Sequence, residues 1–125
     1  MTERLKSHKV ISSLFQKDKS QSFGAYPLRL IWVELDPEEA APAIQSAFSV
    51  PKKAFRRANR RNTLRRRMRE AFRLHKNLLT TTLAAQDKRF ALMWLFTSKE
   101  ELSYAEIEKS MIFAIHRFLR EIKKK

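Results

Sequence analysis

The chain has 125 residues, of which 43% are hydrophobic, so residues 1–125 can fold as a single domain with its own core. Lysine and arginine number 27 against 13 aspartate and glutamate, which leaves a net charge of +14 at neutral pH. The absence of cysteine excludes a disulfide framework and thiolate metal sites. The apolar runs are too short to span a bilayer and the first residues have no signal-peptide core, so we expect a cytoplasmic protein.

The first half of the chain predicts one helix and two strands. Residues 4–17 predict a short helix with an apolar side, and residues 20–27, which hold the only glycine, predict a loop. Residues 28–35 predict a strand, residues 36–42 an acidic turn, and residues 43–50 a second, half-exposed strand.

The second half predicts helix, strand and helix. Residues 55–79 lack glycine and proline and predict a long helix, and residues 90–97 are apolar on both faces, as a central strand would be. Either Ser98 or Ser103 can cap a last helix. The apolar stripe of that helix comprises Ile107, Met111, Ile115, Phe118, Leu119 and Ile122. The order α-β-β-α-β-α predicts a small α/β (α+β) sandwich with a mixed sheet, with room for one extra short strand.

The positive charge is concentrated in the segment that holds the long helix. Residues 51–76 carry 12 basic groups and one acidic group, whereas residues 26–50 carry one basic and four acidic groups. A solvated helix face normally mixes charges of both signs, so this imbalance indicates a binding face for a polyanion. The commonest polyanion is nucleic acid, which we therefore expect as the partner.

The long helix has an apolar stripe beside a cationic face. At helical spacing the stripe is formed by Leu64, Met68, Ala71, Phe72, His75 and Leu79. The adjoining face carries an amide and five cations, namely Asn62, Arg65, Arg66, Arg69, Arg73 and Lys76. Guanidinium groups can hold two phosphate oxygens at once and can stack on bases. Arg61 falls on the packing side, so we expect it at a groove edge where the helix leaves its sheet.

Residues 57–73 read Arg-Ala-Asn-Arg-Arg-Asn-Thr-Leu-Arg-Arg-Arg-Met-Arg-Glu-Ala-Phe-Arg, and this segment resembles the signature of the bacterial ribonuclease P protein component family. The preceding Phe48-Ser49-Val50-Pro51-Lys52-Lys53 is similar to the strand and lysine pair that introduce the signature helix. The amino-terminal Arg4-Leu5, with Ile11 and Leu14-Phe15, is similar to the first helix of that family.

Two residues depart from the family pattern. Thr63 replaces the second arginine of the Arg-Asn-Arg motif, and Arg60 or Arg67 could substitute for it. Ile11 replaces the first aromatic residue of the amino-terminal pattern, so only Phe15 keeps its ring there.

The resemblance implies a fold, a reaction and its partners. The fold is a three-layer α/β arrangement with a left-handed β-α-β crossover, although about 98% of crossovers are right-handed. The reaction is removal of the 5′ leader from precursor tRNA by a separate catalytic RNA that uses Mg²⁺. The protein would bind the ribonuclease P RNA and the precursor, with no catalytic residue or metal site of its own, no membrane partner and no required protein oligomer.

The resemblance also implies site residues. The RNA-binding set is Lys52, Lys53, Arg57, Arg60, Arg61, Asn62, Arg65, Arg66, Arg69 and Arg73. The cleft for the single-stranded leader would be lined by Ile11, Phe15 and Phe48. Phe48 lies on the half-exposed strand, where a stacking platform for bases and an ordinary core position are both open.

Three other functions are open to a basic chain of this size. A structural RNA binder, of ribosomal or double-stranded-RNA type, would have similar charge, and a basic helix could lie on an anionic membrane. An autonomous nuclease would need its own acid, base or metal site. Its only candidates are three scattered histidines, His8, His75 and His116, and the carboxylates in and just before the acidic turn, Glu34, Asp36, Glu38 and Glu39, for which a solvated turn is the simpler interpretation.

Overall fold

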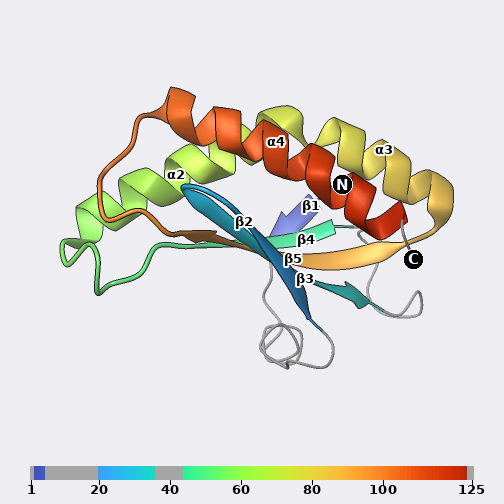
Figure 1. The fold of residues 1–125 in the computed structure, drawn as a ribbon, viewed down its shortest axis with the longest axis horizontal. Coiled ribbons are helices and arrows are strands. Elements are labelled where there is room, and N and C mark those ends of the chain that lie inside the picture. Colours follow the sequence, from blue (N-terminus) through green and yellow to red (C-terminus); the bar gives the residue numbers. More distant parts are fainter. Residues whose placement is uncertain (1, 5–19, 36–43, 124–125) are drawn as a thin grey trace.

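A five-stranded mixed sheet forms the framework of the computed structural model, which describes residues 2–4, 20–35 and 44–123 (Figure 1). β4 is parallel to both β1 and β5, whereas β3 is antiparallel to its neighbours β5 and β2. In order across the sheet the strands are β1 (Thr2–Arg4), β4 (Ile44–Ser49), β5 (Arg89–Phe96), β3 (Leu28–Leu35) and β2 (Gln21–Ala25).

Three helices of the described chain cover one face of this sheet (Figure 1). They are α2 (Ala58–His75), α3 (Asn77–Gln86) and α4 (Tyr104–Lys123). α2 and α3 together connect the adjacent parallel strands β4 and β5, which gives the β-α-β unit that the family resemblance implies. The left hand of this crossover stays a prediction. Among the described residues no helix is long and apolar enough to cross a membrane.

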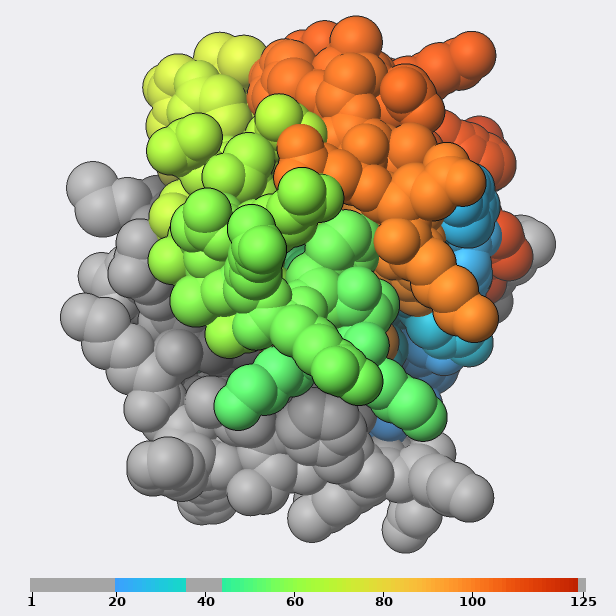
Figure 2. All heavy atoms as spheres, turned by 90° about the vertical axis from the view of Figure 1, so that its left-hand side faces the viewer, coloured from blue at the N-terminus to red at the C-terminus, as the bar shows by residue number. Residues whose placement is uncertain are grey.

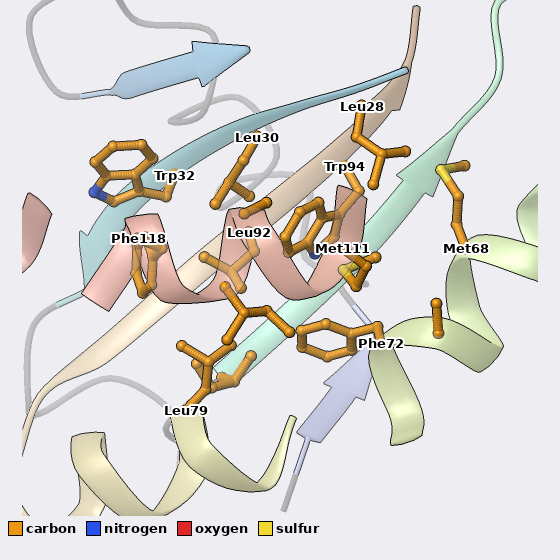
Figure 3. Packing of buried hydrophobic residues seen from close by; sticks show 14 of the residues in the cluster. Leu28, Leu30, Trp32, Met68, Phe72, Leu79, Leu92, Trp94, Met111 and Phe118 are labelled. Carbon is orange, nitrogen blue, oxygen red and sulfur yellow. The ribbon is translucent and has the colours of Figure 1, made fainter. Parts of the chain in front are cut away.

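The main core lies between the sheet and the helices. Leu64, Met68 and Phe72 from α2 are buried, as the stripe predicted, and Phe72 meets Trp94 of β5 with ring centroids 5.9 Å apart. Figure 3 shows Phe72 and Trp94 converging with Met111 of α4 over β5, and all three belong to the same buried cluster. The apolar stripes of α2 and α4 therefore hold both helices on the sheet.

β5 is covered on both faces, which confirms the prediction of a central strand. Leu92 and Trp94 join the core under the helices, whereas Ala91 and Met93 belong to a second cluster that also contains Val33 of β3. Because successive side chains of a strand point to opposite faces, this division follows from the apolar sequence of β5.

Most of the predicted elements are confirmed, with small differences at their ends. β3 has the predicted bounds, β4 and β5 differ from the predicted ranges by one residue at each end, and α4 contains the whole predicted stripe from Ile107 to Ile122. Ser103 is the residue that caps α4, because its Oγ accepts a hydrogen bond from the backbone N–H of Glu106 at 3.2 Å. The acidic turn predicted at 36–42 lies outside the described residues.

Three predictions of local structure are wrong. Residues 21–25, expected in a loop, form β2, because pairing with β3 satisfies their backbone groups. Arg4 ends β1 and therefore does not start a helix, and the rest of the helix predicted at 4–17 lies outside the described residues. The helix predicted at 55–79 begins later and is divided at Lys76 into α2 and α3.

Candidate nucleic-acid interface

The turn between β4 and α2 is fixed by backbone and aromatic contacts. The carbonyl of Pro51 accepts hydrogen bonds from the N–H groups of Ala54 and Phe55, both at 3.2 Å. The Phe55 ring is buried and lies 5.8 Å from the ring of Phe96 at the end of β5. The turn is therefore anchored to the sheet on its inner side, which leaves its polar side chains outside.

Five exposed cations surround the start of α2. They are Lys52, Lys53, Arg56, Arg57 and Arg60. The first turn of α2 contains no acidic residue, and no side chain caps its N-terminal N–H groups. Since a helix N-terminus itself carries partial positive charge, this end of the molecule favours an anion. Figure 2 faces it, and the green side chains of this segment project outward.

Arg56 was missed among the sequence candidates. It is exposed and lies in the same turn as Lys53 and Arg57, so it belongs with the other cations. The charge count over residues 51–76 included it, but the family signature, which begins one residue later, did not.

The partly buried side chain of Arg61 is directed toward the backbone of the turn before α2. Its guanidinium donates hydrogen bonds from Nη1 to the carbonyl oxygens of Phe55, at 2.7 Å, and Arg56, at 2.9 Å. The prediction that Arg61 lies at a groove edge where the helix leaves its sheet stays a prediction, but its charge is partnered by backbone carbonyls rather than left unpaired. Its side chain stabilises the turn, and only the part of it that stays accessible is available to RNA.

The cationic face of α2 is arranged by contacts among its own residues. Arg65 Nη1 donates to Asn62 Oδ1 at 2.6 Å, which orients both side chains. Arg66 is exposed, and Arg69 is exposed with its guanidinium 5.9 Å from the centroid of the Phe48 ring. Asn62, Arg65, Arg66 and Arg69 thus form a continuous polar surface beside β4, as predicted.

Arg73 is partly neutralised at the far end of this face. Its Nε donates to Glu70 Oε2 at 3.1 Å, and its Nη2 donates to the other carboxylate oxygen. The hydrogen bonds from Arg73 lower the pKa of the Glu70 carboxyl, and the same bonds raise the pKa of the Arg73 guanidinium. Both side chains are well exposed, so we assign little stability to the pair.

Arg67 points to the opposite side of α2. Its Nη1 donates to the carbonyl of Leu102 at 2.6 Å and lies 3.7 Å from the Glu101 carboxylate. The hydroxyl of Thr63 donates to the carbonyl of Asn59 at 2.9 Å, within its own helix. Of the two cations suggested as substitutes for the missing signature arginine, Arg67 is therefore engaged with the segment before α4, and Arg60 is the exposed one.

Phe48 is shared between the core and the surface. Its ring lies 5.9 Å from that of Phe72 in an edge-on arrangement and is only partly buried. Arg69 covers part of the ring, which links Phe48 to the cationic face of α2. The other two residues assigned to the leader cleft, Ile11 and Phe15, lie outside the described residues.

The candidate groups for protein-based catalysis are dispersed in the described part of the chain. His75 lies 2.9 Å from Glu108, a pairing that joins α2 to α4, and His116 is exposed on α4. Glu34 is exposed on β3, whereas His8, Asp36, Glu38 and Glu39 fall outside the described residues. No group of three potential metal ligands occurs among the residues that the structure describes.

A small mixed sheet carrying a helix with a continuous arginine face defines a nucleic-acid-binding α/β protein. The family model described as Ribonuclease P matches residues 1–119, so the chain belongs to the ribonuclease P protein family.

Relatives and solved structures agree with this assignment. The ribonuclease P protein component of Porphyromonas gingivalis is 34% identical over 88% of this chain and 78% of its own length. That of Chlorobaculum tepidum is 40% identical over 59% of this chain and 52% of its own length.

The same fold occurs in the ribonuclease P protein of Staphylococcus aureus, with a TM-score of 0.68 and 18% identity over 90% of this chain and 94% of that one. The Thermotoga maritima protein gives a TM-score of 0.69 and 18% identity over 91% of this chain and 96% of that one. At this level of identity the likeness shows a shared fold.

Proposed function

We propose that this chain binds the RNA subunit of ribonuclease P through α2 and the preceding turn, and that it also holds the 5′ leader of precursor tRNA. The observation that carries the proposal is the cationic face of α2, formed by Asn62, Arg65, Arg66 and Arg69 in a member of this family. The leader would pass near Phe48, where a partly exposed ring adjoins a guanidinium.

As part of this proposal, the chemistry belongs to the RNA subunit. Phosphodiester hydrolysis requires groups that hold metal ions or transfer protons, and the described part of this chain offers a surface of arginine and lysine instead. Such a surface repels Mg²⁺ but neutralises phosphates, so Mg²⁺ would be bound by RNA oxygens. The protein would raise activity by holding both RNAs together, in the cytoplasm, where tRNA precursors are processed.

The decisive experiment compares three samples at low Mg²⁺ on a 5′-extended precursor tRNA. They contain this protein alone, a bacterial ribonuclease P RNA alone, and both together. We expect strong cleavage only in the mixture, because the cations of α2 replace part of the counterion charge that the two RNAs need in order to associate.

The other outcomes point to different functions. Cleavage by the protein alone would move the chemistry to this chain. Tight, salt-sensitive RNA binding without stimulation of cleavage would indicate a structural RNA binder.

A further inference from the structure

A second surface feature lies beside the cationic face, at the carboxyl ends of the parallel strands β4 and β5. A groove of about 640 Å³ separates the turn that follows β4 from the segment that follows β5. Figure 2 shows these two segments next to each other, in green and orange, on the end of the molecule where α2 begins. The groove is therefore continuous with the cations around the start of α2.

The wall that follows β5 is held by hydrogen bonds to the turn between β2 and β3. The N–H and hydroxyl of Thr97 both donate to the carbonyl of Pro27, at 2.7 and 3.0 Å. The buried hydroxyl of Ser98 accepts from Tyr26 Oη and from the N–H of Glu100, both at 3.0 Å. The opposite wall is the turn already fixed at Pro51, so both walls of the groove are held in place by hydrogen bonds within the protein.

The charged groups that line the groove are cations. Lys53 belongs to one wall and Lys99 to the other, and both are exposed. No carboxylate is among the lining residues in the described part of the chain. The nearby Glu101 lies 3.7 Å from Arg67, which offsets its charge. Glu100, which is exposed and follows Lys99, does not line the groove, so an anion between Lys53 and Lys99 meets only cations among the charged lining residues.

The remaining lining is mostly apolar. Pro51, Ala54 and Leu95 supply surface against which a ribose or a base can pack. Cationic walls with an apolar floor are the combination that binds a nucleic acid strand, since phosphates and sugars or bases alternate along it.

We propose that this groove binds a segment of RNA backbone, with phosphates at Lys53 and Lys99 and the attached sugars or bases against Pro51, Ala54 and Leu95. The inference rests on the proposed function and extends the RNA interface beyond α2 to the segment after β5. The strand could belong to the RNA subunit or to precursor tRNA, and these two sources are separated by experiment.

Crosslinking tests the position directly, because the chain has no cysteine and a single Lys99→Cys substitution creates one attachment point. A photoreactive group attached there would be irradiated with the ribonuclease P RNA alone and, separately, with precursor tRNA alone. Lys109→Cys is the matched control, since Lys109 is exposed and lines a different groove, of about 440 Å³, together with the carboxylate of Glu106.

We expect the probe at position 99 to crosslink one of the two RNAs in clear excess over the probe at position 109. Crosslinks to the RNA subunit, or to the precursor, support the groove and identify the strand that occupies it. Equal yields from the two positions with both RNAs would overturn the proposal.

Salt dependence gives a second, independent readout. Plotted against log salt, the logarithm of the association constant falls with a negative slope. Loss of one phosphate contact reduces the magnitude of this slope by about 0.7–0.9. The ratio of the Kd of Lys99→Ala to that of the wild type should therefore fall about threefold as monovalent salt rises from about 50 to about 200 mM. Lys109→Ala should give a ratio near one at both salt concentrations.

Different results would contradict the proposed function and the RNA-binding groove. If the unsubstituted protein neither binds the RNAs nor stimulates cleavage, the proposed function fails. If it does both and Lys99→Ala behaves as Lys109→Ala does, only the groove is overturned.

Discussion

At the scale of single residues, the basic side chains of this protein divide into two groups that the sequence does not distinguish. Arg61, Arg67 and Arg73 donate to acceptors within the protein, to backbone carbonyls or to Glu70. Arg66 is exposed and has no hydrogen bond or ion pair with the described residues. The formal charge of residues 51–76 therefore overstates the number of cations that are ready to bind phosphate.

Substitution of Arg66 by alanine should weaken RNA binding. The exposed guanidinium neutralises about one phosphate, so Arg66→Ala should reduce the magnitude of the slope of log K against log salt by about 0.7–0.9. Protein stability should stay nearly unchanged. Filter binding over a salt series measures this effect. Arg120→Ala is the control, because Arg120 is also exposed but lies in the last turn of α4. Equal slopes for the wild type and Arg66→Ala would show that this face does not contact the RNA.

Substitution of Arg61 should act on stability instead. Arg61→Ala removes two hydrogen bonds to backbone carbonyls of the turn before α2. We expect the free energy of unfolding to fall by about 1–2 kcal/mol, measured by urea denaturation. Arg60→Ala, one residue away and exposed, should change it by less than about 0.5 kcal/mol. If the two variants are equally stable, the hydrogen bonds of Arg61 contribute nothing to the fold.

The candidate site was predictable as a surface but not in its internal contacts. Helical periodicity alone placed Arg65, Arg66 and Arg69 on one face, because it depends only on spacing. The bond from Arg67 to Leu102 joins residues 35 positions apart, and no local pattern encodes such a contact. The position of Lys99 in the wall of the groove likewise depends on how β4 and β5 are paired.

At the scale of elements, the helices and strands with a clear pattern of apolar residues were predicted correctly. An element whose conformation depends on hydrogen bonds to a neighbouring strand was not. β3 and β5 have enough buried residues to be recognised as strands. β2 buries only Phe23 fully, so its extended conformation depends on hydrogen bonds to β3.

α3 was missed for a related reason. The predicted helix stopped at Leu79, and the three consecutive threonines that follow it, residues 80–82, have low helix propensity. Burial of Leu79 and Leu83 outweighs that preference. The helix instead ends at Gln86 and is capped by Asp87, which adopts a left-handed conformation with φ of 52°.

The N-terminus of α4 gives a prediction at this scale. Ser103 Oγ accepts the N–H of Glu106, and the Ser103 carbonyl accepts the N–H of Ile107 at 3.1 Å. Ser103→Ala removes the side-chain cap and should lower the free energy of unfolding by about 1 kcal/mol. Thr81→Ala, at an exposed position within α3, is the control and should leave stability unchanged or slightly raised. A Ser103→Ala protein as stable as the wild type in urea would show that the cap is dispensable.

At the scale of the whole molecule, most of the net charge lies in one segment, since residues 51–76 carry 12 basic groups and one acidic group. α2 and the turn before it hold the cations, while the sheet and α4 supply the core that fixes them in place. A net charge of +14 on 125 residues makes the folded protein repel itself, since folding brings the arginines of α2 close together. Two such charges about 10 Å apart cost ~0.4 kcal/mol in water.

Salt should therefore stabilise the isolated protein. Raising monovalent salt from about 10 to about 150 mM shortens the Debye length from about 30 to about 8 Å, which screens the repulsion along α2. Summed over several pairs the gain is about 1 kcal/mol, which corresponds to a rise in Tm of roughly 3–6 °C. The few exposed ion pairs, such as that of Arg73 with Glu70, weaken in salt but contribute little.

Thermal unfolding monitored by circular dichroism over a salt series checks this expectation. An uncharged solute at the same osmolality separates screening from general solvent effects. A variant with Arg56 and Arg57 both changed to glutamine carries two fewer charges at the crowded end and should show a smaller rise. A Tm that stays constant or falls with salt would mean that the arginines of α2 do not repel one another enough to matter. In that case RNA would stabilise the protein only because it binds the folded state, by about 2.7 kcal/mol when the free RNA concentration is 100 times Kd, and relief of charge repulsion would add nothing.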